Sequence, residues 1–232
     1  MSVGFCNSGC VNDESNANNE CNANNEGGVN DEDVANKEVI ANNESGSAQD
    51  KLCGFGLDSP VVFVGFMGAG KSSTGRRLAK TCGVSCIDTD KYIESRVNMS
   101  VGDFFMFHSE EEFRELEAEV LEELLSGEPC FITCGGGIVV GDKSREILKN
   151  SKATVIFLKI SADGAKKRIR NYNNRPLFGD IENARRINSQ RQPWYEEVAD
   201  YTIDVENKMP SDVAYEVRKT LLRRGILCPK RK

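Results

Sequence analysis

The fold of this chain is decided by residues 61–72, VVFVGFMGAGKS. The first four residues are an apolar run rich in β-branched side chains, typical of a strand buried on both faces of a parallel sheet. Residues 65–72 fit the pattern Gly-x-x-x-x-Gly-Lys-Ser, in which successive backbone N–H groups surround an anion. A helix predicted over 74–82 follows, and the positive end of its dipole adds to the field. This order of strand, glycine-rich loop and helix predicts a phosphate-binding site.

The residue types in this loop indicate how it would hold a nucleotide. Lys71 would reach the β- and γ-phosphates, and the hydroxyl of Ser72 would ligate Mg²⁺. The alternative is a chance glycine-rich turn, but the predicted strand and helix on either side argue against it. The nucleotide-binding set that we expect here is Gly68, Ala69, Gly70, Lys71, Ser72 and Ser73.

The composition changes near Leu57. Residues 1–57 are rich in Asn, contain Ala-Asn-Asn-Glu three times and hold ten acidic residues against two lysines. We expect a disordered acidic tail there, because too few apolar side chains are present to form a core. We expect one folded domain over 58–232, whose charges nearly balance. A nucleic-acid partner is therefore not expected.

The chain has no segment that we expect to target an organelle or span a membrane, so we expect a cytoplasmic protein. Nine cysteines and a single histidine are present, without Cys-x-x-Cys pairs. Reduced thiols are the expected state, rather than a zinc site.

Strand-like and helix-like segments alternate along the domain, which indicates an α/β fold with a parallel sheet covered on both faces. Ligands in such sheets bind beyond the carboxyl ends of the strands. The predicted strands are 61–64, 84–87, 130–134, 153–160 and 201–205. The predicted helices are 74–82, 111–125, 142–150, 162–170, 181–199 and 211–224.

Two predicted strands are followed by residues that could bind a substrate or take part in catalysis. Asp88 and Asp90 follow the second strand and would lie on one face, where one carboxylate could serve Mg²⁺ and the other could accept a hydroxyl proton. The alternative for either residue is a helix N-cap. Gly135, Gly136 and Gly137 follow the third strand and predict a nest of backbone amides that faces a substrate, rather than a simple turn.

Arginines on helices and loops give further candidates. Arg114 and Glu117 share a helix face at i, i+3, and spacing alone favours an ordinary surface ion pair. Arg175 lies in the Pro- and Gly-containing segment 173–179, which we expect to be a mobile lid that brings a positive charge to a transferring phosphoryl group. Aromatic packing explains Trp194 but not the nearby Arg191.

Taken together, these motifs resemble the shikimate kinase family. The resemblance runs from about Ser59 to Leu227 and includes, in order, the phosphate loop, Asp-x-Asp, Phe-Arg-x-x-Glu, Gly-Gly-Gly, Arg-Pro-Leu and Arg-x-Pro-x-Tyr. It implies a P-loop NTPase fold, a three-layer α/β/α sandwich with a five-stranded parallel sheet and a mobile lid. It also implies a monomer that uses ATP and Mg²⁺ to phosphorylate the 3-hydroxyl of shikimate, on the route to chorismate and the aromatic amino acids.

The resemblance also implies a role for each candidate residue. Asp90 would hold the substrate hydroxyls and act as general base, and Asp88 would bind Mg²⁺ through water. On the nucleotide side, Arg175 would contact the nucleotide and the transferring phosphate, and Arg168 would lie beside the adenine, with 203–210 as an adenine-binding loop. The implied shikimate site consists of Asp90, a carboxylate clamp of Arg114 and Arg191, the orienting Glu117, the amides of Gly135, Gly136 and Gly137, and the ring walls Phe105 and Phe113.

Two other hypotheses about the function remain open. A P-loop kinase for another hydroxylated acid such as gluconate would share the phosphate loop, but a neutral polyol face has no need for two arginines. A non-catalytic regulatory relative would keep the fold, yet such a protein usually loses one of its charged catalytic groups. All of them are present here: Lys71, Ser72, Asp88, Asp90 and Arg175.

Overall fold

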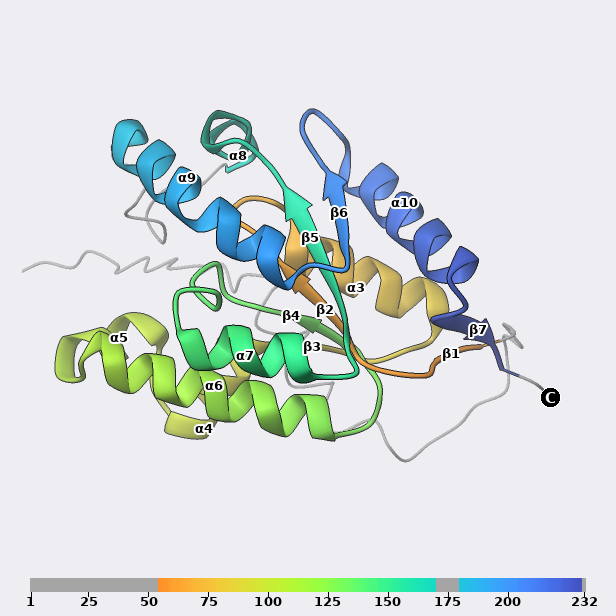
Figure 1. Cartoon of the computed structure of the whole chain (residues 1–232), viewed down its shortest axis with the longest axis horizontal. Coiled ribbons are helices and arrows are strands. Elements are labelled where there is room, and N and C mark those ends of the chain that lie inside the picture. Colours follow the sequence, from red (N-terminus) through yellow and green to blue (C-terminus); the bar gives the residue numbers. More distant parts are fainter. Residues whose placement is uncertain (1–53, 170–179, 231–232) are drawn as a thin grey trace, which may run out of the picture. The chain divides into compact units, whose positions relative to one another are not determined.

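A computed structural model describes residues 54–169 and 180–230 of the chain. Its main sheet has five parallel strands in the order β3-β4-β2-β5-β6, with helices on both sides (Figure 1). The predicted α/β class and five-stranded parallel sheet are confirmed. The strands are β2 (Val61–Val64), β3 (Cys86–Asp88), β4 (Phe131–Thr133), β5 (Thr154–Lys159) and β6 (Tyr201–Asp204).

The helices cover the two faces of the sheet as separate layers. Val61 and Phe63 of β2 join a core with α3, α8, α10 and the N-terminal part of α9, whereas Val62 and Val64 join a second core with α4, α5, α6, α7 and the C-terminal part of α9. All four β2 side chains are fully buried, as expected for a central strand with both faces covered. The helices are α3 (Lys71–Cys82), α4 (Thr89–Val97), α5 (Val101–Phe107), α6 (Glu110–Ser126), α7 (Asp142–Asn150), α8 (Ala162–Arg168), α9 (Ile181–Val198) and α10 (Pro210–Arg223).

Several predicted boundaries differ from the structure. Helix α3 begins at Lys71, three residues earlier than predicted, because Gly70 has a left-handed φ of 92° and turns the chain directly into the helix. Strand β3 starts two residues later than predicted, after the left-handed Gly83 ends α3. Helix α7 has the predicted bounds.

Two helices and two strands were not among the predicted elements, although the N-cap alternative for the aspartates allowed a helix at α4. Helix α5 begins where the Ser100 side chain accepts a hydrogen bond from the Asp103 amide. Strand β1 (Phe55–Leu57) pairs antiparallel with β7 (Leu227–Pro229). Because β1 lies within the segment 1–57 assigned to the tail, the predicted boundary at Leu57 is too late: backbone pairing with the far end of the chain makes 55–57 part of the fold.

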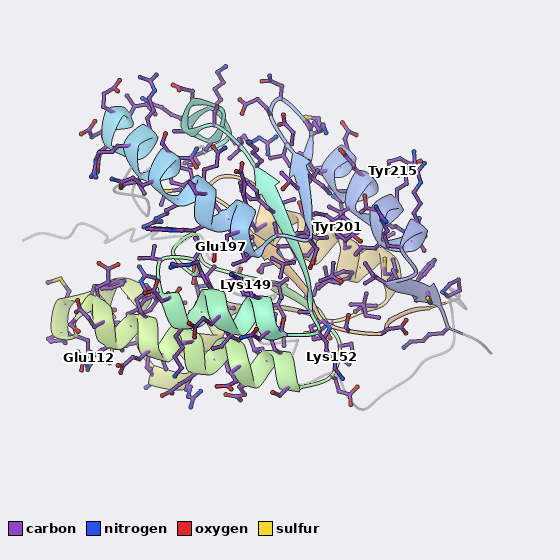
Figure 2. All side chains as sticks on the ribbon, viewed as in Figure 1. Glu112, Lys149, Lys152, Glu197, Tyr201 and Tyr215 are labelled. Atoms are coloured by element: carbon purple, nitrogen blue, oxygen red, sulfur yellow. The ribbon has the colours of Figure 1, made fainter. Side chains whose placement is uncertain are left out.

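Residues 1–53 of the predicted tail lie outside the described residues, as does the predicted lid segment with Arg175. Within the described part, no helix is long and apolar enough to cross a membrane. Helices α7 and α9 lie against each other, and Figure 2 labels the pair that links their outer surfaces: Lys149 donates a 2.9 Å hydrogen bond to Glu197.

Candidate active site

The phosphate loop connects β2 to α3 and has the backbone that its glycines predict. Gly65 has a φ of 140°, and a Cβ at this position would lie 2.5 Å from the Leu158 carbonyl oxygen, so only glycine fits. Lys71 is buried and donates hydrogen bonds to the carbonyls of Gly65 at 2.7 Å and Phe66 at 3.2 Å. The loop thus holds its lysine over its own backbone, from where a nucleotide phosphate can compete for the ammonium group.

The two predicted magnesium-side residues lie together. Ser72 donates a 2.7 Å hydrogen bond to Oδ2 of Asp88, at the end of β3. Thr133, at the end of β4, donates to the same oxygen at 2.8 Å. Sequence reasoning missed Thr133, because a threonine inside an apolar strand carries no signal of its own. The hydroxyl and carboxylate oxygens fit Mg²⁺, which is usually held by one or two carboxylates, water and substrate phosphates.

Asp90 lies in the first turn of α4, beside the loop formed by Gly135, Gly136 and Gly137, which we call the glycine loop. A Cβ on Gly135 would be 2.5 Å from its Oδ1, so the absence of a side chain at 135 leaves room for the carboxylate. Burial, with the Asp88 charge second, raises the pKa of Asp90 to about 6. The N-cap alternative is wrong for Asp90, which lies inside the helix, whereas Asp88 occupies the N-cap position, although without a side-chain capping bond.

Arg114 and Glu117 form a buried pair, so the surface-pair interpretation is wrong. Glu117 is 2% exposed and accepts a hydrogen bond from Nη1 of Arg114, while Glu110 accepts one from Nη2 at 2.8 Å. A Cβ on Gly137 would lie 2.6 Å from Nη1. Burial raises the pKa of Glu117, and the Arg114 guanidinium offsets part of that rise. A positive charge is thus fixed at the glycine loop, opposite Asp90.

Helix α9 brings the second predicted clamp arginine to the same loop. Arg191 donates a 3.1 Å hydrogen bond to the Gly136 carbonyl, and the Tyr195 hydroxyl donates to the same oxygen at 2.5 Å. Tyr195 is fully buried, and its burial raises its pKa to about 12. Its contact was not predicted, although Tyr195 stands in the Arg-x-Pro-x-Tyr motif. Because it stays protonated, it can act as a permanent donor that fixes Gly136.

The three glycines form less of an amide nest than predicted. The Gly135 amide donates to the Thr89 hydroxyl at 3.2 Å, so it is occupied within the protein. The described glycines with left-handed φ do not include these three. Glycine is therefore required at 135 and 137 by the close approach of Asp90 and Arg114 rather than by backbone conformation.

The two predicted ring walls lie beside Arg114. The ring centroids of Phe105 and Phe113 are 4.7 Å apart, and the guanidinium carbon of Arg114 is 5.5 Å from the Phe113 centroid. Phe113 is buried, whereas Phe105 is 43% exposed. The apolar surface next to the charged groups is thus partly open to a ligand.

Arg168, which we predicted to lie beside the adenine, is the last residue of α8. It donates to the Ala69 carbonyl at 3.3 Å, to the Lys208 carbonyl at 2.7 Å and to the Val205 carbonyl. It therefore joins the phosphate loop to the predicted adenine-binding loop. The two halves of the site also meet at Gly136, where a Cβ would be 3.3 Å from the Met67 amide nitrogen of the phosphate loop.

Comparison with known proteins agrees with this arrangement. The shikimate kinase family model matches residues 67–222. Shikimate kinases of Dictyoglomus turgidum and Streptococcus gordonii are 35% and 37% identical over 170 and 161 residues, covering 71% and 68% of this chain and 98% and 97% of their own. The structure of Acinetobacter baumannii shikimate kinase in complex with shikimate superimposes with a TM-score of 0.67 at 31% identity, covering 72% of this chain and 94% of that one. The chain belongs to the shikimate kinase family.

Proposed function

We propose that this chain transfers the γ-phosphoryl group of ATP to the 3-hydroxyl of shikimate, with Asp90 as general base and Arg114 and Arg191 as the carboxylate clamp. One observation carries this assignment. The loop 135–137 contacts Asp90, Arg114 and Arg191 and also adjoins the phosphate loop at Met67. A carboxylate bound at the arginines would therefore place a ring hydroxyl between Asp90 and the terminal phosphate.

The end of the site that contains Arg114 and Arg191 suits a planar anion. A guanidinium group forms two parallel hydrogen bonds to a carboxylate, which fixes its orientation as well as its position. Glu117 holds one edge of the Arg114 guanidinium, so the arginine is oriented before the substrate binds. Binding energy at the carboxylate is thereby used to position the hydroxyl at the other end of the ring.

The transfer step needs a proton acceptor and a stabilised negative charge. Asp90 would take the proton of the 3-hydroxyl while that oxygen attacks the γ-phosphorus and the bond to the β–γ bridging oxygen breaks, which gives ADP and shikimate 3-phosphate. A pKa of about 6 leaves Asp90 ionised at neutral pH yet more basic than an ordinary aspartate. Lys71 would leave the carbonyls of Gly65 and Phe66 for the β- and γ-phosphates, and Arg175 would add a further charge.

Mg²⁺, when bound, would neutralise phosphate charge and align the terminal phosphates. Ser72 and Asp88 would hold it, Asp88 through water, and Thr133 would orient the Asp88 carboxylate. We also propose that the protein acts as a monomer, since every residue assigned here lies on one chain.

The test is ADP release by the full-length chain with ATP and Mg²⁺, with shikimate, gluconate or no acceptor, and with Lys71→Ala as the blank. We expect turnover with shikimate only, and its loss in Lys71→Ala. Turnover with gluconate would favour a kinase for another hydroxylated acid. Nucleotide binding without turnover on either acceptor would favour a non-catalytic role.

A further inference from the structure

Arg145 of α7 contacts both sides of the hydrogen bond that joins Arg191 to the glycine loop. Its side chain is 15% exposed. On one side it bonds to the turn that follows the glycine loop, and on the other it lies against α9, the helix that carries Arg191. A guanidinium group with so little exposure to water has to use its donors within the protein.

On the loop side, Arg145 fixes the turn that leaves the glycine loop. Nη1 of Arg145 donates hydrogen bonds to the carbonyls of Val139 at 2.6 Å and Val140 at 3.2 Å. The Val140 amide in turn donates to the Gly137 carbonyl at 2.8 Å. The guanidinium therefore holds the end of the turn 138–140, and a backbone hydrogen bond connects that turn to the last residue of the glycine loop.

On the helix side, the same guanidinium lies over the Trp194 ring, with its central carbon 5.1 Å from the ring centroid. A cation in this position is attracted by the negative face of the indole. Nε of Arg145 also forms a 3.5 Å ion pair with Glu197, further along α9. Trp194 stands between Arg191 and Tyr195, and both of these residues donate hydrogen bonds to the glycine loop.

Helix α9 depends on such outside contacts near Arg191, because its own backbone is weakened there. Pro193 lies inside the helix. A proline has no N–H group to donate, so the helical ladder loses one hydrogen bond at this turn. The packing of Trp194 then has a larger share in holding the turn and the arginine that it carries.

We propose that Arg145 is a positioning residue for Arg191, on which it acts through Trp194. It also holds the glycine loop, to which Arg191 bonds, through the turn 138–140. This inference rests on the proposed role of Arg191 in binding the substrate carboxylate. Because one guanidinium holds both the helix and the loop, the place of Arg191 is set before the substrate arrives. A lysine cannot replace it, since an ammonium group lacks the planar fork that donates at its edge and stacks through its face.

Three variants test the inference. Arg145→Met removes the charge, and Arg145→Lys keeps the charge without the fork. Each should raise KM for shikimate about fivefold to tenfold, with kcat and KM for ATP within about twofold of wild type. Trp194→Leu removes the other partner of the stack and should also raise KM for shikimate. Because both changes break the same contact, combining Arg145→Lys with Trp194→Leu should raise KM by less than the product of the two single effects.

Lys149→Met is the matched control. It removes another link between the same two helices, the 2.9 Å hydrogen bond to Glu197 (Figure 2), and leaves the Arg145 guanidinium in place. Its KM for shikimate should stay within about twofold of wild type, because an exposed ion pair contributes little.

A second readout does not depend on turnover. Trp194 is the only tryptophan of the chain, so its fluorescence reports on the stack and gives Kd for shikimate by titration. The emission should change in Arg145→Met and Arg145→Lys but not in Lys149→Met.

Wild-type KM for shikimate in both Arg145 variants would overturn the proposal. A rise in KM that Lys149→Met matches, or one that leaves the Trp194 emission unchanged, would overturn it as well. A wild type that neither binds nor phosphorylates shikimate would instead refute the proposed function, and with it the clamp on which this inference rests.

Discussion

Gly135→Ala should disable phosphoryl transfer without unfolding the protein. The new Cβ would lie 2.5 Å from Oδ1 and 3.2 Å from Cγ of Asp90, whereas ordinary contact begins at 3.4 Å. The carboxylate or the glycine loop must therefore move by about 1 Å. A displacement of that size at a reacting group costs on the order of 10² in rate.

The surroundings of Asp90 leave it little freedom to yield. Asp90 is half-buried, and the neighbouring Thr89 hydroxyl accepts a 3.2 Å hydrogen bond from the Gly135 amide, which ties α4 to the loop. We therefore expect kcat to fall about 100-fold, equivalent to about 2.7 kcal/mol of transition-state stabilisation. Gly135 is not in a left-handed conformation, so the backbone itself tolerates alanine.

The assay is ADP release at saturating ATP and shikimate, together with a thermal melt of the same preparation. Gly102→Ala is the control, since a Cβ there would meet nothing closer than Ser100 Oγ at 3.7 Å. A kcat within threefold of wild type for Gly135→Ala, with an unchanged Tm, would refute the assignment of Asp90 as general base held against this loop.

Five further changes have directions fixed by the structure. Because the pKa of Asp90 is raised to about 6, kcat/KM should fall about tenfold per pH unit below pH 6, and a profile flat to pH 5 would contradict its role. The raised pKa also means that ionisation costs stability above about pH 6, so Asp90→Asn should raise Tm at pH 8 by roughly 2–6 °C in a thermal melt. Arg114→Lys should raise KM for shikimate about tenfold in steady-state kinetics, and more than kcat changes, because an ammonium group cannot form the two-pronged contact. Thr133→Val removes the 2.8 Å bond to Asp88 and should raise the Mg²⁺ concentration for half-maximal activity about threefold. Deleting residues 1–50 should leave kcat and Tm nearly unchanged, whereas deleting 1–57 also removes β1 and should lower Tm in the same melt.

The main sheet could be predicted because its strands are short apolar runs followed by turn residues, and because strand and helix patterns alternate. Helix α7 was predicted to the residue since Gly141 and Ser151 bound a clear helical pattern. Helix α5 was missed because Val101–Phe107 is too short and too rich in aromatic residues to show a helical period. Strands β1 and β7 were missed because three-residue strands gain their stability from pairing across the whole length of the chain.

The types of residue in the site could be predicted more readily than their neighbours. Charged and glycine residues at the carboxyl ends of strands indicated Asp88, Asp90 and the glycine loop. Spacing could not tell whether Arg114 and Glu117 were buried, because that depends on Gly137 approaching from β4. Hydrogen bonds such as those of Thr133 and Tyr195 join elements far apart in the sequence, and no local pattern encodes them.

The neighbours of the loop 135–137 explain why it consists of three glycines. Gly135 leaves room for the Asp90 carboxylate, and Gly137 leaves room for the Arg114 guanidinium. Between them, the Gly136 backbone lies against Met67 of the phosphate loop, while its carbonyl is held by Arg191 and Tyr195. A side chain at any of the three positions would push a charged group or the phosphate loop outward. In the proposed mechanism, the bare backbone therefore sets the short distance between the acid-binding end and the phosphate-binding end, which phosphoryl transfer requires.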